Sequence, residues 1–329
     1  MAGYLLRNCC AGRKHFPLVL MLEPLEACNL SCPGCGRIRE YAEDSGRRLS
    51  LQQCLAAVDE CPAPVVSICG GEPLLYAEIG ELVARIVARR RHVYLCTNAL
   101  LLKKRLYEFR ASTRLSINVH LDGMEATHDQ AVGQQGVFLE AIAGIKAAKA
   151  AGFLVCTNTT VYRQTDMHEI LVLFEYLAEL GVDGMMLSPP YPYQATAQCD
   201  PDRAKQIFLT REEIYAKFRP VRRQLSRLKL ITSPLYLEAL CGLRQLSCAA
   251  WASPTRTVRG WKSPCYLVTD THYETYEDLV GKTDWRKIGP GNDRRCDDCL
   301  VHCGFEPAAV LAANRRLRDA IRMALWQLT

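Results

Sequence analysis

Three cysteines stand within eight residues near the start of the chain, at Cys28, Cys32 and Cys35. Their C-x₃-C-x₂-C spacing lets one loop present three thiolates to a metal, and soft sulfur ligands select iron–sulfur clusters or zinc. A four-iron cluster held by only three thiolates keeps one iron without a protein ligand, and that iron can bind a small chelating molecule. A zinc knuckle is the alternative interpretation of the same spacing.

A second motif, Gly70-Gly71-Glu72-Pro73, follows a short apolar segment at residues 65–68. Glycines at a strand end let the backbone approach a ligand closely, so carbonyls can accept from an ammonium group while Glu72 adds a charged acceptor. A tight surface turn is the alternative. The cysteine loop and this turn together resemble the signature of the radical S-adenosylmethionine (SAM) superfamily. The resemblance implies a [4Fe–4S] cluster whose open iron chelates SAM and whose electron cleaves SAM to a 5′-deoxyadenosyl radical.

Four further cysteines gather near the end of the chain, at Cys265, Cys296, Cys299 and Cys303. Four thiolates are enough to close a cluster completely, and this set resembles the auxiliary cluster domains of many radical SAM enzymes. A structural zinc site with four cysteines looks similar in sequence and remains the alternative. Cys248 is a reserve ligand, and His302 could also substitute.

Apolar strand-like segments alternate with amphipathic helical segments through the first 190 residues or so. The predicted strands cover residues 16–25, 65–68, 92–96, 114–119, 153–160 and 184–188, and the predicted helices 51–60, 79–90, 100–109, 137–151 and 168–180. This rhythm predicts right-handed βαβ units and an α/β fold with a parallel sheet. Six repeats fit a partial (β/α)₆ barrel, the fold of the resembled superfamily, followed here by a C-terminal cysteine-rich auxiliary domain.

Polar residues end several of the predicted strands, where such barrels keep their chemistry. With the Gly70–Glu72 turn, they form the predicted cofactor-binding set: Asn98, Asp122, Asn158 and Ser188. Asn98 and Asn158 are expected to contact the ribose or the carboxylate of SAM, and Asp122 a ribose hydroxyl. Turn, helix-cap or core-polar roles are the alternatives for these side chains.

The composition is that of an ordinary globular protein, with 329 residues, 49% hydrophobic and 23% charged. Seventeen cysteines are an odd number in a long chain, which favours metal ligation over a disulfide framework. The net charge of +6 permits an anionic partner but does not argue for nucleic acid. No apolar run reaches about 18 residues, and no signal peptide is apparent, so a cytoplasmic location is expected.

The chain divides by pattern into an N-terminal extension (1–15), the barrel (16–195), a C-terminal domain (196–306) and a terminal basic amphipathic helix (307–329). A basic helix at residues 212–225 is expected to kink or break at Pro220. In the terminal helix, apolar and basic residues recur together: Leu317, Ile321, Leu325 and Leu328 with Arg315, Arg316, Arg318 and Arg322. Such a helix can lie on an anionic membrane or simply pack as a cap.

Longer stretches resemble the adenosyl-hopene transferases, and they lie at residues 17–24, 55–60, 94–101, 119–123, 181–186, 264–267 and 299–304. The chain departs from that family at Cys69 and in the loop 190–194. The resemblance implies addition of the 5′-deoxyadenosyl radical to the exocyclic alkene of diploptene, giving adenosylhopane, with an electron donor such as flavodoxin or ferredoxin. The alternative is a radical SAM tailoring or peptide-modifying enzyme that abstracts hydrogen and releases 5′-deoxyadenosine.

An addition mechanism leaves a radical on the lipid that must be quenched, and a thiol is a suitable hydrogen donor because its S–H bond is weak. Cys96, at the end of the third predicted strand, lies in a Tyr-Leu-Cys-Thr-Asn stretch that resembles the family's cysteine-bearing segment. It is therefore the predicted catalytic thiol, with Cys69 and Cys156 as competitors. Burial as a small apolar residue is the alternative for all three.

Overall fold

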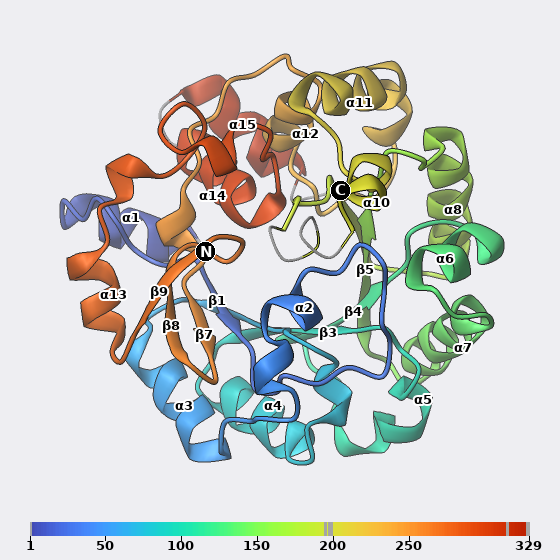
Figure 1. Cartoon of the computed structure of the whole chain (residues 1–329), viewed down its shortest axis with the longest axis horizontal. Helices are drawn as coiled ribbons and strands as arrows, with labels where there is room; N and C mark the ends of the chain where they lie inside the picture. Colours follow the sequence, from blue (N-terminus) through green and yellow to red (C-terminus); the bar gives the residue numbers. More distant parts are fainter. Residues whose placement is uncertain (1, 194–195, 197–199, 314–315, 327–329) are drawn as a thin grey trace.

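The computed structural model describes residues 2–193, 196, 200–313 and 316–326, and it is built around one nine-stranded sheet (Figure 1). The strand order is β6-β5-β4-β3-β2-β1-β7-β8-β9. The strands are β1 (Val19–Leu22), β2 (Val65–Ile68), β3 (His92–Thr97), β4 (Leu115–His120), β5 (Leu154–Thr160), β6 (Gly184–Ser188), β7 (Thr255–Thr257), β8 (Gly260–Pro264) and β9 (Thr269–Tyr273).

The first six strands are all parallel, and each βα unit follows the previous one along the sheet. Helices cover the outer face of the curved sheet: α3 (Leu51–Glu60), α4 (Ile79–Ala88), α5 (Leu102–Arg105), α6 (Glu125–Val132), α7 (Val137–Ala150) and α8 (Met167–Glu179) (Figure 1). The predicted partial barrel is confirmed. Its first strand is shorter than the 16–25 predicted, and the 100–109 helix is α5 followed by a 3₁₀ turn at Leu106–Glu108.

Alternation along the strands separates the core from the barrel interior. In β3, Val93 and Leu95 are fully buried beneath the helices, whereas Tyr94 and Cys96 point the other way and are half-buried. Since the period of a strand is two residues, the same alternation places polar side chains of the neighbouring strands on the inner face. Local signals fix the helix starts, as at Ser50, whose side chain and backbone exchange hydrogen bonds with Gln53 in a capping box.

The remaining helices belong mainly to the C-terminal region or the chain ends: α1 (Ala2–Cys10), α2 (Arg37–Glu40), α10 (Pro201–Ile207), α11 (Arg211–Leu225), α12 (Pro234–Leu240), α13 (Tyr276–Lys282), α14 (His302–Ala313) and α15 (Leu317–Trp326). Helix α11 runs unbroken through Pro220, contrary to the expected kink or break. Its capping box at Thr210 and Glu213 and the buried Phe218 anchor it before the proline, and the buried Val221 and Leu225 anchor it after the proline.

The C-terminal region continues the barrel's own sheet. Strand β7 pairs in parallel with β1, at Met21 with Thr255 and Leu22 with Arg256, and β8 and β9 follow as antiparallel strands. The boundary predicted after residue 195 falls on a residue outside the described part of the chain. The pairing shows that the two predicted parts share a continuous sheet, so the C-terminal cysteines are attached to the barrel through β7 and β8.

The predicted boundary between residues 306 and 307 falls inside α14, which already carries Cys303. The terminal segment is therefore two helices, α14 and α15, rather than one. Helix α15 is held on its inner side, where Arg244 donates to both carboxylate oxygens of Asp319 at 3.0 Å. The predicted N-terminal extension forms α1, whose Leu5 packs in a small apolar cluster with Phe16 and Ala308.

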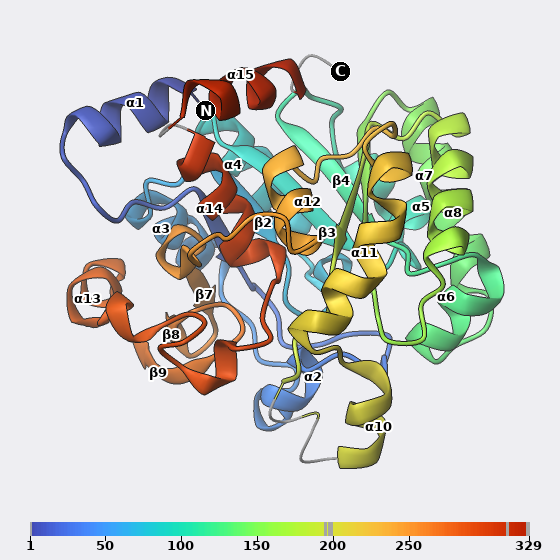
Figure 2. The ribbon, with the colours of Figure 1, turned by 90° about the horizontal axis from the view of Figure 1, so that it is seen from above.

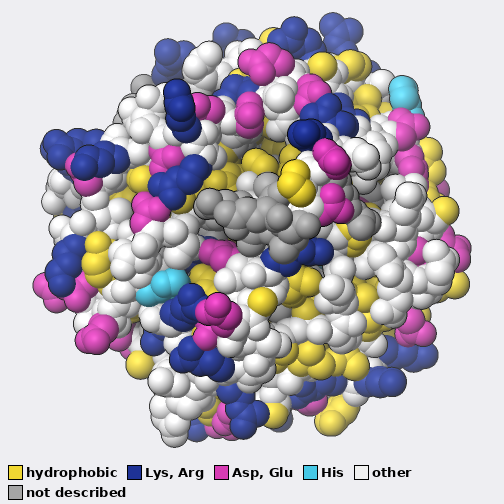
Figure 3. Space-filling model, viewed as in Figure 1, with side chains coloured by type: hydrophobic (Ala, Val, Ile, Leu, Met, Phe, Trp, Pro, Cys, Tyr) yellow, Lys and Arg dark blue, Asp and Glu magenta, His cyan; other side chains and the backbone are white. Residues whose placement is uncertain are grey.

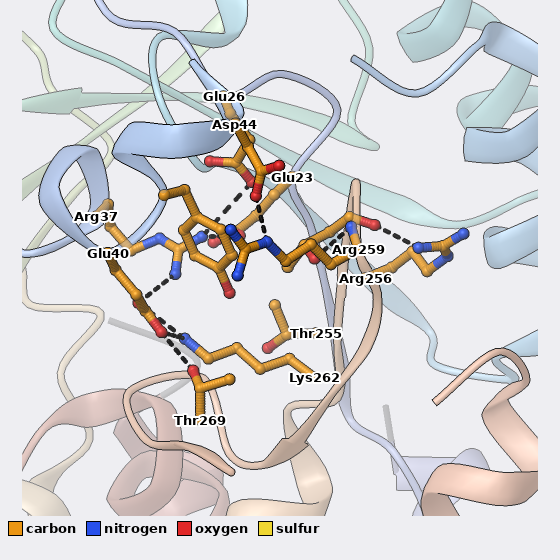
Figure 4. Close-up of polar contacts among 12 residues, drawn as sticks. Glu23, Glu26, Arg37, Glu40, Asp44, Thr255, Arg256, Arg259, Lys262 and Thr269 are labelled. Atoms are coloured by element: carbon orange, nitrogen blue, oxygen red, sulfur yellow. Dashed lines mark hydrogen bonds and ion pairs between the residues drawn. The ribbon is translucent and has the colours of Figure 1, made fainter. Parts of the chain in front are cut away.

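A buried charge network joins the C-terminal strands to the segment that follows the cysteine loop (Figure 4). Lys262 of β8 is fully buried and donates to both carboxylate oxygens of Glu40 at 2.9 and 3.1 Å. Glu40 also accepts from Arg37, at 2.9 Å, and Arg37 in turn pairs with Glu23 at the end of β1. Each charge in this network depends on its partners, because an unpaired ion is costly to bury.

Replacing Lys262 by Met should therefore destabilise the protein by about 3–5 kcal/mol, because Glu40 would keep its burial and lose its main partner. Chemical unfolding followed by circular dichroism measures the change. Lys282→Met is the matched control: Lys282 pairs with Asp278 on the surface, so its loss should leave the free energy of unfolding nearly unchanged. Equal effects of the two substitutions would contradict the structural role of the buried pair.

Candidate metal and cofactor site

The cysteine loop leaves β1 and ends at α2, and its three thiols are free and half-buried. The amide of Leu30 donates to Cys28 Sγ at 3.4 Å, and Asn98 Nδ2 lies 3.9 Å from the same sulfur. Arg39 donates to the carbonyls of Cys32, at 3.1 Å, and of Cys35. Amides aimed at sulfur, and side chains that hold the ligating loop, are the usual surroundings of a thiolate site.

The glycine turn lies directly against this loop. A Cβ atom on Gly71 would stand 1.9 Å from the Ala27 carbonyl oxygen, so no larger residue fits there. Gly70 adopts φ +104°, a conformation that favours glycine. A cavity opens beside the two segments, and its lining residues include Cys28, Gly71, Glu26 and Arg37.

Glu72 is engaged by the protein itself. Its carboxylate accepts from the Thr97 hydroxyl and the Asn98 amide, each at 2.8 Å, and from the Leu74 amide at 2.9 Å. The side chain is buried and joins the glycine turn to the end of β3. This geometry favours a bracing role for the carboxylate, and direct binding of a ligand ammonium by Glu72 stays a prediction. The carbonyls of the glycine turn are the better candidates for that contact.

The polar strand ends are not all brought to one place. Asn98 Nδ2 donates to Asn29 of the cysteine loop at 2.8 Å, so Asn98 holds the loop. Asn158 Oδ1 is buried without a hydrogen-bond partner in the described part of the chain, which makes it a free acceptor. Ser188 Oγ instead accepts from the His302 amide at 3.2 Å, beside the C-terminal cysteines. Its predicted contact with SAM therefore stays a prediction without support from this geometry.

Asp122 forms a pair that the sequence reasoning missed. His120 Nε2 lies 2.8 Å from Asp122 Oδ2, and the other carboxylate oxygen accepts from the Thr160 amide at 2.7 Å. Burial alone would lower the pKa of His120, but the Asp122 carboxylate and the Asn158 carbonyl outweigh it and raise that pKa. The pair therefore favours the protonated imidazole at this strand end. The sequence pattern that could have predicted this pair is His-Leu-Asp at a strand end, because residues two apart in a strand point to the same face.

Cys96 points into the barrel interior. Its Sγ lies 3.5 Å from Ser67 Oγ and accepts from Asn118 Nδ2 at 3.7 Å. Burial raises the pKa of this thiol, so it stays protonated at neutral pH. Cys156 is level with Cys96 two strands away, across Asn118, and Cys69 is more deeply buried at the end of β2. The three candidate thiols thus lie on or next to β2, β3 and β5 of the same sheet, and Cys96 is the least buried.

The C-terminal cysteines line one pocket with about 430 Å³ of empty space. Five thiols face it rather than four, and they are Cys248, Cys265, Cys296, Cys299 and Cys303. The amides of Leu267 and Val268 both donate to Cys265 Sγ at 3.3 Å. Burial raises the pKa of Cys296 to about 11 and of Cys299 to about 12, so only a bound cation would keep these groups ionised.

The donor chemistry fits iron–sulfur clusters at both places. Among the described residues, no three His, Cys, Asp or Glu side chains converge as ligands of a single metal ion. In a four-iron cluster each thiolate binds its own iron, so its cysteines do not have to meet at one ion. Three free thiols on one loop, of which Cys28 lines a cavity, and five thiols around an apolar pocket suit that arrangement. His302, the proposed substitute ligand, has a buried Nδ1 without a partner in the described structure.

Comparison with known families agrees with this division of the chain. The family model described as "Radical SAM superfamily" matches residues 22–177, and a "Domain of unknown function (DUF3463)" matches residues 185–323. The first match contains the cysteine loop, the glycine turn and Cys96. The second contains all five thiols of the C-terminal pocket together with α14 and part of α15.

Two similar curated proteins match over about half of the chain. The AdoMet-dependent heme synthase of Methanosarcina barkeri is 31% identical over 170 residues, covering 50% of this chain and 48% of the relative. The GTP 3′,8-cyclase of Xanthomonas axonopodis pv. citri is 32% identical over 173 residues, covering 49% and 52%. The chain thus spans about half the length of the curated relatives it matches.

Two solved structures share the fold over most of the chain. Streptococcus suis SuiB bound to precursor peptide SuiA superposes with a TM-score of 0.66 at 17% identity, covering 91% of this chain and 73% of SuiB. Native anSMEcpe with bound AdoMet gives 0.57 at 13% identity, covering 95% and 97%. At these identities the likeness concerns the fold, including the placing of a C-terminal region beside the barrel.

The His120–Asp122 pair predicts a pH dependence. A raised folded-state pKa means that the pair's stabilisation is fully present below the unfolded pKa of His, about 6.5, and is lost as pH rises through the folded value. Asp122→Asn should therefore destabilise the protein more at pH 6 than at pH 9, as measured by urea unfolding at each pH. The substitution keeps an acceptor for Thr160. A loss that is constant or grows with pH would contradict the pair.

Proposed function

Because residues 22–177 belong to the radical SAM superfamily, we propose that this chain is an enzyme that adds a 5′-deoxyadenosyl group to an alkene of a hopene-type isoprenoid lipid. The observation that carries this proposal is the protonated thiol of Cys96 inside the barrel, between Ser67 and Asn118. An addition leaves a carbon radical on the substrate, which must be quenched by a hydrogen atom or by an electron and a proton. A hydrogen atom taken from the Cys96 thiol leaves a thiyl radical, which one electron from the external donor and a proton return to the thiol. Resemblance to the adenosyl-hopene transferases names diploptene as the substrate.

Each part of the site has a distinct task in this mechanism. Cys28, Cys32 and Cys35 would hold a [4Fe–4S] cluster, and the carbonyls of Gly70 and Gly71 would orient the amino group of SAM. When bound, the cluster and SAM supply a 5′-deoxyadenosyl radical. Glu72 keeps the glycine turn in place through its three hydrogen bonds. Polar groups further along the barrel mouth, on Asp122, His120 and Asn158, are available to the ribose.

The hydrogen transfer depends on how Cys96 is held. Asn118 donates to its sulfur, so the S–H bond points away from that amide, and the Ser67 hydroxyl, 3.5 Å from the sulfur, can accept it. Burial keeps the proton on sulfur, so the group can donate a hydrogen atom rather than react as a thiolate. Cys96 is only half-buried, whereas Cys69 and Cys156 are buried, so Cys96 is the most accessible of the three candidates. These three properties support Cys96 over the more buried Cys69 and Cys156.

The C-terminal pocket is the proposed auxiliary site. Its thiols outnumber the ligands of one cluster, which supports a second [4Fe–4S] cluster held by Cys265, Cys296, Cys299 and Cys303, with Cys248 adjacent. A structural zinc ion bound by four of the five is the alternative. An external one-electron donor, such as a flavodoxin or ferredoxin, is needed in either case to reduce the N-terminal cluster.

A second candidate function is hydrogen abstraction from a substrate, with release of free 5′-deoxyadenosine. The likeness to SuiB in complex with its precursor peptide, together with the C-terminal thiol pocket, favours this tailoring chemistry. The two candidates differ in the fate of the adenosyl carbon. It is bonded to the product in the first and is lost as 5′-deoxyadenosine in the second.

Anaerobic incubation with SAM, a reductant and diploptene, followed by mass spectrometry, separates the two candidates. The proposal predicts a product whose mass equals diploptene plus the adenosyl group and one hydrogen. The Cys28→Ala/Cys32→Ala/Cys35→Ala variant should cleave no SAM and should contain about four fewer irons per chain. Stoichiometric free 5′-deoxyadenosine without lipid adduct would favour the tailoring function, and SAM cleavage by the triple variant would contradict both.

Replacing Cys96 by Ala should leave SAM cleavage and adenosyl addition intact, because neither step uses the thiol. The saturated adduct should fall at least tenfold and be replaced by an unsaturated or dead-end adduct, as product masses will show. Cys156→Ala is the matched control, since Cys156 is level with Cys96 on β5 and should be dispensable. A normal yield of saturated adduct from the Cys96→Ala enzyme would place the hydrogen donor elsewhere.

Contact with a membrane is the remaining part of the proposal. No helix in the described residues is long and apolar enough to cross a bilayer. Helix α15 exposes an apolar stripe, with Leu317 79%, Ile321 51% and Leu325 59% exposed, while Asp319 and Met323 face inward. The predicted Leu328 and Arg315 lie outside the described residues. On the face drawn in Figure 3, basic and acidic side chains are interspersed, so that face gives no footprint for nucleic acid.

The stripe on α15 should bind vesicles that contain anionic lipid, and binding should weaken with salt because exposed arginines flank it. Replacing Leu317, Ile321 and Leu325 together by Gln should reduce co-sedimentation at least fivefold. Leu139→Gln is the control, since Leu139 is 56% exposed on α7, far from this stripe in the chain. Equal sedimentation of the triple variant and the parent would leave α15 with a packing role only.

A further inference from the structure

The rigid aromatic loop after β6 lies between the two cysteine sites. Tyr193 packs against the N-terminal site at Gly36. A Cβ atom on Gly36 would stand 1.9 Å from the Cγ atom of the Tyr193 ring. Gly36 directly follows Cys35. The ring of Tyr193 therefore occupies the side-chain position of the residue next to a predicted cluster ligand, and only glycine leaves room for it.

Tyr191 continues the contact toward the C-terminal site. Its ring meets that of Tyr193 edge to face, with centroids 5.2 Å apart and an interplanar angle of 90°. Tyr191 lines the pocket of five thiols, and its hydroxyl donates to the carbonyl of Arg295, the residue before Cys296, at 3.2 Å. Two rings in van der Waals contact thus span the space from one cysteine set to the other.

The surroundings of the pair are dry. Tyr191 is 8% exposed and belongs to an apolar cluster with Leu267, Val268 and Val301, against which Tyr193, Cys265, Cys299 and Cys303 pack. The two rings and the apolar side chains around them therefore fill the space between the two cysteine sites.

We propose that Tyr191 and Tyr193 form an electron path between the two cysteine sites. The proposal rests on the proposed function, because it requires a cluster at each site. In the transfer, one electron leaves the reduced C-terminal cluster and enters the oxidised N-terminal cluster, with no bond made or broken and no proton moved. The C-terminal site then acts as a store that returns an electron to the SAM site after each cleavage.

The same contact could serve only to pack the loop, and the ring chemistry separates the two roles. An electron path needs a continuous aromatic contact but not the hydroxyl groups. The Tyr191→Phe/Tyr193→Phe variant should therefore transfer electrons between the two clusters at the rate of the parent. Leucine at both positions fills much of the space and removes the rings. A purely structural role would instead be sensitive to the hydroxyl of Tyr191, through its bond to Arg295.

The test uses the full chain with both sites loaded, reduced completely and then separated from the reductant. One equivalent of SAM is added, and the electron paramagnetic resonance signal of the C-terminal cluster is followed by freeze-quenching. In the parent and the double Phe variant this signal should decay as the N-terminal cluster is re-reduced. In the Tyr191→Leu/Tyr193→Leu variant the decay should be at least tenfold slower, at unchanged iron content and unchanged first-equivalent SAM cleavage.

The Tyr191→Leu single variant keeps the contact of Tyr193 with Gly36 and should slow the decay of the signal similarly. It therefore tests the electron path even where the double Leu variant loses iron. Equal decay in the parent and in Tyr191→Leu would overturn the electron path while leaving the proposed function standing. A parent with about four irons per chain would overturn the path through its premise, because no second cluster would exist. Loss of SAM cleavage in the parent itself would count against the proposed function instead.

Discussion

The buried arginine that follows the cysteine loop is the interaction on which the rest of the structure depends. Arg37 pairs with Glu23 at the end of β1 and with Glu40 in its own helix, and its guanidinium lies 4.5 Å from the centroid of the Tyr41 ring. Glu40 in turn forms an ion pair with Lys262 on β8. A buried charge is tolerated only with its partners in place, so the loop, the first strand and the C-terminal strands must form together.

This charge network joins the loop of the N-terminal cysteines to β8, the strand that precedes the C-terminal cysteines. The two cysteine sets are therefore attached to one sheet. Burial works to raise the pKa of Glu40, but Lys262 and Arg37 outweigh it and lower that pKa, so the carboxylate stays charged between its partners. In Figure 2, α2 lies at the edge of the molecule opposite to α1 and α15. The cysteine loop, which leads into α2, is therefore fixed on one side of the fold, and the exposed stripe of α15 lies on the other.

Local patterns were sufficient to predict the barrel. The alternation of strands and helices, the Ser50 cap and the positions of Cys28, Cys32 and Cys35 are local or nearly local signals, and the structure has six βα units in that order. The pairing of β7 with β1 was not predictable, because β7 has three residues and its partner lies more than 200 residues away. A strand that short carries no periodic signal.

Side-chain partners across long sequence separations were equally out of reach. Glu72 carries the chemistry of a ligand contact, yet Thr97 and Asn98 occupy its carboxylate. Ser188 ends the sixth strand as expected but meets the His302 amide 114 residues later. Cys248 was identified as a reserve ligand, whereas only the folded chain brings it to the same pocket as the other four. Spacing predicts which residues can ligate a metal, and tertiary packing decides which of them meet.

The central claim is that each cysteine set holds a [4Fe–4S] cluster and that the N-terminal one alone binds SAM. Mössbauer spectroscopy of anaerobic protein loaded with ⁵⁷Fe, before and after adding SAM, tests it most directly. The account predicts four-iron cluster spectra from about eight irons per chain, with about one-eighth of the iron signal shifting when SAM binds the open iron. Four-iron cluster spectra that do not respond to SAM, or zinc in place of iron at the C-terminal site, would contradict it.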